Sequence, residues 1–295
     1  MKLTLSFLLS LLIFSATFSQ DLVRYTNNNG ESHLSGNFKI EDLEKDPEFK
    51  KWFVKNYTAY KTSEIKEDWA NRFKDVTVQI FMGTWCSDSK KWVPKFVKLW
   101  DELGLKRTQL NFVALYDSIE GKYKQSPNGQ EKDWEVHRLP TIIFNKDDQE
   151  LGRIIESPIN SLRTDVAQIA LGVPSEPNYR TANRMIQLLK TTPIESLMSD
   201  SNSIEQLRKI VKNSSELNTL ARVYLESNRI DKALVVFYFN TQLFENESKI
   251  YANYAKALTA SGQIKKAIKN YKKALILDGG NIEIKKQLKK LRGIN

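Results

Sequence analysis

Apolar positions in the first part of the chain alternate between strand-like runs and helix-like spacings. Short apolar runs predict strands at 76–82, 110–116, 140–145 and 150–155. Three-and-four spacing predicts helices from Pro47 onward, at 62–74, at 86–103 and at 159–171. Residues 117–137 are polar and predict a long loop, and residues 20–44 predict an irregular or weakly paired lead-in. This order of elements predicts an α/β domain over residues 45–172.

The chain after Asn178 predicts helices only, and part of it repeats. A shift of 34 residues superposes Ala221 on Ala255 and Ala233 on Ala267. This period, with small residues at these steps, resembles the tetratricopeptide repeat. We therefore expect a linker at 173–178 and an all-α domain at 179–295. It would hold repeats at about 214–247 and 248–281, a degenerate helix pair at about 195–212 before them, and a C-terminal capping helix.

The two ends of the chain carry their own patterns. Residues 1–19 begin with one lysine, continue as a short apolar run and end in small residues, which predicts a cleaved signal peptide and export. An uncleaved anchor is the alternative. Residues 262–295 hold ten Lys or Arg against two acids, within a net charge of +10. Outside a cell this disfavours nucleic acid as a partner; it permits an anionic surface, although solvated faces of amphipathic helices explain it more simply.

The most specific motif surrounds Cys86, the single cysteine of the chain. An apolar strand leads into Trp85 and Cys86, a predicted helix follows with Pro94 inside it, and a later strand opens with Leu139 and Pro140. The motif itself runs Gly83, Thr84, Trp85, Cys86, Ser87, Asp88, Ser89, Lys90. Together these residues resemble the active-site half of a thioredoxin-fold protein in which Ser89 replaces the second cysteine.

The thiol chemistry follows from the position of Cys86 at a helix start. Unpaired backbone N–H groups and the helix dipole favour the reactive thiolate there. Lys90 adds positive potential and the Ser89 hydroxyl is expected to donate to the sulfur, whereas the charge of Asp88 opposes the thiolate. A single thiol cannot resolve a mixed disulfide by itself, because that step needs a second thiol.

The thioredoxin resemblance implies further roles for neighbouring residues. It implies a mixed sheet flanked by helices, a helix kinked at Pro94, and Trp85 packed as a shield over the sulfur. It implies a cis peptide bond at Pro140 that presents the backbone of Leu139 to a substrate chain. It also implies a departure, since Ile80 stands where thioredoxins keep a buried acid. The motif is similar to a branch of exported bacterial proteins, so a periplasmic or secreted location is expected.

Two functions of different classes fit these residues, and whether the chain is an enzyme stays open. The first is an exported monothiol thioredoxin-like protein that forms a mixed disulfide between Cys86 and a client, with an external thiol as the resolving reductant and the repeats binding a partner. The alternative is a redox-inactive scaffold for protein–protein interaction. A weaker third hypothesis is a covalent homodimer through Cys86. One cysteine and two distant histidines, His33 and His137, predict no metal site and no cofactor, and His137 is expected at the surface.

Overall fold

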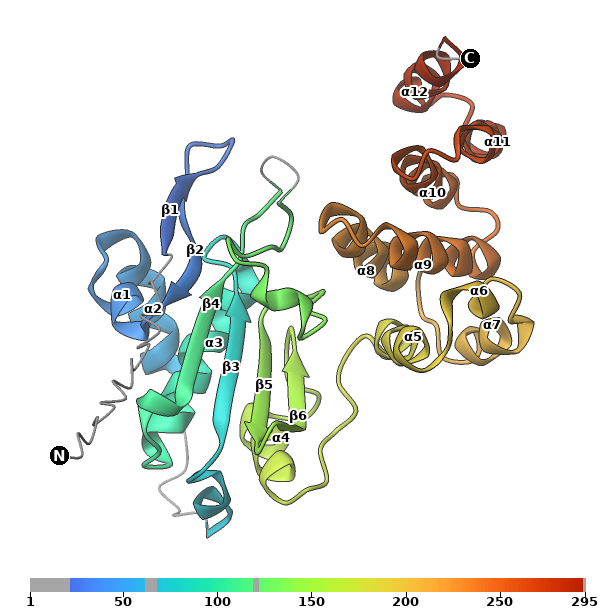
Figure 1. The fold of residues 1–295 in the computed structure, drawn as a ribbon. Coiled ribbons are helices and arrows are strands. Elements are labelled where there is room, and N and C mark those ends of the chain that lie inside the picture. Colours follow the sequence, from blue (N-terminus) through green and yellow to red (C-terminus); the bar gives the residue numbers. More distant parts are fainter. Residues whose placement is uncertain (1–21, 62–67, 119–121, 294–295) are drawn as a thin grey trace, which may run out of the picture.

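The computed structural model describes residues 22–61, 68–118 and 122–293, which form an α/β unit followed by a row of helices (Figure 1). The expected signal peptide lies outside the described residues, as does the first half of the helix predicted at 62–74. Within the described part, no helix is long and apolar enough to cross a membrane.

The α/β unit is built on a six-stranded mixed sheet in the order β1-β2-β4-β3-β5-β6. Only β3 and β4 pair in parallel, and every other neighbouring pair is antiparallel. The strands are β1 (Val23–Thr26), β2 (Ser32–Phe38), β3 (Thr77–Met82), β4 (Leu110–Ala114), β5 (Thr141–Lys146) and β6 (Gln149–Ile155). The four strands predicted from apolar runs are therefore confirmed as the centre and one edge of the sheet.

Helices cover one face of this sheet and enclose the larger core of the unit. Phe96 and Trp100 from the helix after β3 pack there with Phe144 from β5. The helical segments of the unit are α1 (Ile40–Lys45), α2 (Pro47–Ala59), the 3-10 turn Asp68–Phe73, α3 (Ser87–Glu102), the 3-10 turns Arg107–Gln109 and Gln130–Lys132, and α4 (Leu162–Ala170). At the predicted second helix, the described residues hold only the 3-10 turn.

The expectation of an irregular lead-in at 20–44 is wrong. This segment forms β1, β2 and α1, and β2 pairs with β4 inside the sheet. The apolar pattern fails here because several buried positions of β2 carry small or polar side chains. Ser35 is fully buried and its hydroxyl donates to the carbonyl of Ala114 at 3.4 Å, so a polar side chain is satisfied where an apolar one was sought.

A loop covers the opposite face of the sheet. Residues 115–118 and 122–140, here called the β4–β5 segment, fold across that face. Val136 and Leu139 from this segment pack on Phe81, Val113 and Ile143, whose side chains point away from the helical face. Cys86, Trp85 and Trp134 lie against the same small cluster. The thiol thus sits at the edge of the core that the loop completes.

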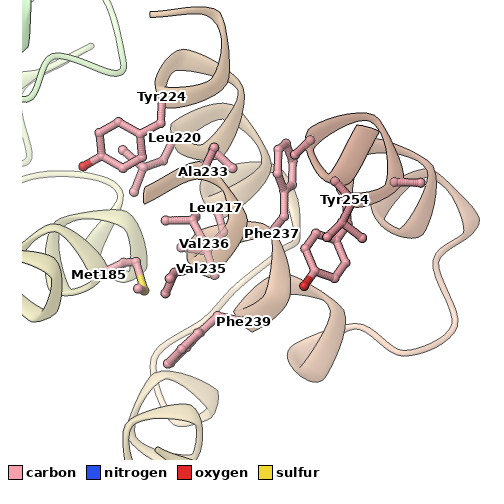
Figure 2. Close-up of a cluster of buried hydrophobic side chains, with 14 of the residues drawn as sticks. Met185, Leu217, Leu220, Tyr224, Ala233, Val235, Val236, Phe237, Phe239 and Tyr254 are labelled. Atoms are coloured by element: carbon pink, nitrogen blue, oxygen red, sulfur yellow. The ribbon is translucent and has the colours of Figure 1, made fainter. Parts of the chain in front are cut away.

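The second unit consists of antiparallel helices that share one elongated core. Ala233 lies at the centre of this core beside Leu217 and Tyr224 (Figure 2). Its helices are α5 (Arg180–Thr191), α6 (Ile194–Leu197), α7 (Ser201–Arg208), α8 (Ser215–Glu226), α9 (Ile230–Leu243), α10 (Ser248–Ala260), α11 (Ile264–Leu277) and α12 (Ile282–Arg292). The repeat pairs are α8 with α9 and α10 with α11, α6 and α7 precede them, and α12 is the capping helix.

The small residues of the 34-residue repeat lie where the helices approach most closely. Ala221, Ala233, Ala255 and Ala267 are all fully buried. A methyl side chain lets two helix backbones approach, and the large side chains around it fill the remaining space. The repeat pattern in the sequence therefore corresponds to the packing of the helices.

The two units have separate cores. Every buried residue of the large α/β core lies between Leu34 and Ala170, and every buried residue of the helical core lies between Ala182 and Leu291. Residues 173–178 contain no helix or strand, yet they are held against the α/β unit: the Asn178 side chain donates to the carbonyls of Ile155 and Ser157.

We predict that a fragment ending at Gly172 folds by itself, because its core contains no residue of the helical unit. Circular dichroism and limited proteolysis of the fragment test this, with the full chain as the control. An unfolded fragment would mean that the contacts between the units, and not the core of the α/β unit, hold its sheet together.

Candidate functional site

Cys86 occupies the turn between β3 and α3. It is the N-cap residue of α3, and its carbonyl accepts the first helical hydrogen bond from Lys90 N–H at 3.0 Å. The side chain is half-buried, and its sulfur donates to the carbonyl of Leu139 at 3.5 Å. The thiol is therefore positioned both by a helix N-terminus and by the backbone before Pro140.

Trp85 packs on the short turn that precedes the thiol. Its ring nitrogen donates to the carbonyl of Leu115 at 2.8 Å, at the start of the β4–β5 segment. A side chain at Gly83 would not fit, since its Cβ would lie 2.7 Å from the Trp85 ring. The glycine of the motif is thus explained by the close approach of the indole.

Ser89 and Pro94 are both buried on the inner side of α3. The Ser89 hydroxyl accepts a hydrogen bond from Gly83 N–H at 3.2 Å and so closes the turn that carries the thiol. We expected this hydroxyl to donate to the sulfur; the described bond goes to the Gly83 backbone instead, because the side chain points under the turn. Its role in chemistry stays a prediction.

Leu139 and Pro140 lie opposite the thiol, joined by a cis peptide bond. Leu139 is buried in the small core of the loop-covered face. The carbonyl of Pro140 accepts a hydrogen bond from Glu156 N–H at 2.7 Å, which ties the start of β5 to the end of β6. These residues and Cys86 form the side of the site to which a substrate chain was expected to bind.

The two charged residues of the motif diverge from the thiol. Burial raises the pKa of Tyr179, and so do its hydrogen bond to the Glu156 carboxylate and the nearby charge of Asp88. Asp88 therefore faces the junction with the helical unit. Burial lowers the pKa of His33, and the charge of Lys90 lowers it further. Lys90 therefore faces the side of the sheet that carries β2.

The β4–β5 segment holds several buried polar residues that sequence reasoning missed. Lys124 is only 5% exposed, and its amine donates to the carbonyl of His137 at 2.8 Å. His137 was expected at the surface but is buried, and burial together with the charge of Lys124 lowers its pKa to about 3. The segment looks polar in sequence because it packs charged groups against the sheet, and apolar spacing gives no indication of this.

The same segment binds the first repeat of the helical unit. Glu135 is buried, and its carboxylate pairs with Arg229 at 2.8 Å and with Lys232 at 2.7 Å. Gln125 donates to the carbonyl of Glu226 at 2.9 Å and Arg138 donates to that of Ser215 at 3.1 Å. In Figure 1 the segment lies between the sheet and α8. One loop thus contacts both the thiol and the repeats.

A cavity of about 580 Å³ lies at the junction of the two units. It is lined by residues that follow β6, by the linker and by the turn between α7 and α8, among them Glu156, Ile159, Tyr179, Arg180, Ile210 and Lys212. Ile159 and Ile210 expose 47% and 36% of their surface there. Because Glu156 is bonded to Pro140, this cavity adjoins the substrate side of the thiol.

The basic C-terminal helices are separate from this site. The ten Lys and Arg residues of 262–293 are all exposed, and none forms an ion pair within the described residues. The expected anionic surface as a partner stays a prediction.

Comparisons with known proteins agree with this division. Thioredoxin H9 of Arabidopsis thaliana is 27% identical over 118 residues, which is 38% of this chain and 76% of that protein. A protein family described as a TPR domain matches residues 148–278. The chain is a thioredoxin-like unit joined to tetratricopeptide-like repeats. The family match begins inside β6, so its first residues fall in the thioredoxin-like unit.

We predict that acid destabilises the chain through His137. Its pKa is about 3 in the folded state and ~6.5 in the unfolded chain, so between these values only the unfolded chain binds the proton. The free energy of unfolding should therefore fall as pH drops through this window, by roughly 3–5 kcal/mol for this group.

Urea unfolding of wild type and His137→Gln at pH 7.5 and pH 4 measures the effect. The variant should lose much less stability on acidification, because glutamine does not titrate. An equal loss in both proteins would contradict the burial of a neutral imidazole.

Proposed function

We propose that this chain is an exported monothiol thioredoxin-like protein that exchanges disulfides with client proteins. The observation that carries the proposal is the placement of Cys86 at the N-terminus of α3, with its sulfur facing Leu139 beside Pro140. Ser89 occupies the place of the resolving thiol, and the chain has no other cysteine.

The proposed reaction has two exchange steps. The thiolate of Cys86 attacks one sulfur of a client disulfide; that S–S bond breaks, a mixed disulfide forms, and the second client sulfur leaves as a thiolate. A thiolate of an external reductant then attacks the mixed disulfide and displaces the client or Cys86. The client gains two electrons, which come from the external thiols.

The repeats are proposed to bind the client or a partner that delivers it. Tetratricopeptide-like repeats support protein–protein interaction, and here they contact the same loop that borders the thiol. The adjoining cavity offers two exposed isoleucines and the polar groups of Arg180 and Lys212 to the chain that flanks a client cysteine. The client segment would run from Cys86 across Leu139 and Pro140 into this cavity. Residues 1–19 would direct export.

The rival proposal is a redox-inactive scaffold. It is favoured by Ile80, a fully buried apolar residue where thioredoxins keep an acid, and by the partial burial of the thiol. The two proposals differ in one observable, the formation of reducible adducts at Cys86.

We predict that wild-type protein expressed in its native compartment and trapped with acid forms adducts that disappear on reduction. Non-reducing gels read out the result, and Cys86→Ala is the matched control because it removes only the sulfur. Adducts in both proteins, or in neither, would favour the scaffold. An adduct of twice the mass of the chain would identify the homodimer instead.

We predict that the wild-type protein reduces insulin slowly and that Ser89→Cys raises the rate severalfold. A cysteine one helical turn after Cys86 restores the intramolecular step that releases the mixed disulfide. Ser87→Cys is the matched control, because it adds a thiol at an exposed position of the same turn with the wrong spacing. If wild type turns over as fast as Ser89→Cys, a single thiol is not what limits the reaction.

A further inference from the structure

Lys124 is a buried lysine that the exchange reaction described above does not use. Lysine is almost never fully buried unless it is paired. Within the described residues, the only hydrogen bond of the Lys124 amine is to the carbonyl of His137 at 2.8 Å, and no carboxylate forms an ion pair with it. A group held this way at an energetic cost calls for a reason.

The backbone holds Lys124 beside the thiol from two sides. Lys124 N–H donates to the carbonyl of Tyr116 at 3.0 Å, and the neighbouring Leu115 accepts the bond from the Trp85 ring. On the other side, the amine of Lys124 and the sulfur of Cys86 donate to carbonyls only two residues apart, those of His137 and Leu139. The amine and the thiol thus share one short stretch of backbone.

The charges around the amine leave it close to the balance between its two forms. Burial lowers the pKa of Lys124 to about 7, and the positive charges of Arg138 and Arg222 lower it as well. The thiolate of Cys86 and the carboxylate of Glu156 act in the opposite direction and raise it. At neutral pH the amine therefore exists in both forms, and a negative charge on the sulfur favours the protonated form.

We propose that Lys124 is the proton-transfer partner of Cys86, the group that takes up the thiol proton and returns it during disulfide exchange. The inference rests on the function proposed above. It assigns the position of the missing acid a replacement from the loop: Ile80 offers no titratable group below the thiol, and Lys124 offers one from the β4–β5 segment.

The proton is conserved through the step. The neutral amine of Lys124 takes the proton of the Cys86 thiol, which gives an ammonium beside a thiolate. The thiolate attacks the client disulfide, the S–S bond breaks, and the departing client sulfur carries the electron pair. The ammonium then gives its proton to that sulfur, and the amine is neutral again. A buried lysine suits this role because burial shifts it easily between forms.

Two substitutions separate charge from proton transfer. Lys124→Met removes both, and Lys124→Arg keeps a permanent positive charge but releases no proton near neutral pH. Lys50→Met is the control, since it removes one exposed cation on α2, far along the chain from the thiol. Lys124→Gln, which keeps a donor toward His137, replaces the methionine variant if that variant does not fold by circular dichroism.

Two probes distinguish the steps of the reaction. Iodoacetamide reports how much thiolate is present, because it requires no proton donor. The two disulfide probes are 5,5′-dithiobis(2-nitrobenzoic acid), whose aromatic thiolate leaves without a proton, and hydroxyethyl disulfide, whose alkyl thiolate is a poorer leaving group. All rates are measured across pH 5.5–9 on the full-length chain.

The expected pattern is specific. At pH 7, Lys124→Met should react with iodoacetamide about tenfold more slowly than wild type, the effect of one lost neighbouring charge. Lys124→Arg should react with iodoacetamide and with the aromatic disulfide at least as fast as wild type, but several times more slowly with hydroxyethyl disulfide. A purely structural role would slow both variants equally with every probe.

The contrary outcomes are equally distinct. If both variants match Lys50→Met with all three probes, Lys124 takes no part and the inference is wrong. If wild-type Cys86 is alkylated but reacts with neither disulfide, the proposed exchange function fails, while the alkylation rates still decide whether Lys124 controls the thiolate. If wild type is unreactive toward all three probes, both proposals fail.

Discussion

The β4–β5 segment covers a face of the sheet with a loop, and both the thiol site and the attachment of the repeats depend on that packing. Val136 and Leu139 bury the apolar side chains of β3, β4 and β5 on this face. Because the segment is a loop, it also brings backbone carbonyls close to the sheet. Two of these carbonyls, from His137 and Leu139, accept hydrogen bonds from Lys124 and Cys86. A helix would have used most of its carbonyls internally.

The segment carries an electrostatic burden that its surroundings must satisfy. Glu135 is buried, and an unpaired carboxylate in such a place is strongly unfavourable. It is matched by Arg229 and Lys232, which belong to the other unit. The helical repeats therefore complete the charge balance of a loop in the thioredoxin-like unit. The two units have separate cores, but their polar contacts are shared, which links the repeat surface to the border of the thiol site.

The site is consequently more than a helix start with one cysteine. Its thiol lies between a turn closed by Ser89, an indole held by Leu115, and a loop that buries a lysine and a neutral histidine. Each of these contacts comes from a different part of the chain. A monothiol site of this kind relies on outside thiols for release of the client, so the surfaces that bring a client to it matter as much as the sulfur itself.

Much of this arrangement follows from the sequence alone, because it depends on short-range patterns. The apolar runs and spacings determined the central strands, α2, α3 and the two repeat pairs, and the motif around Cys86 located the thiol at a helix start. The polar strand β2 was missed, since its buried serine is satisfied by a strand that lies far away in the chain. His137 was misplaced for the same reason. Burial of a polar residue depends on partners that only the tertiary structure brings together, so Lys124, Glu135 and His137 acquire their properties in the folded chain and leave no pattern in the sequence.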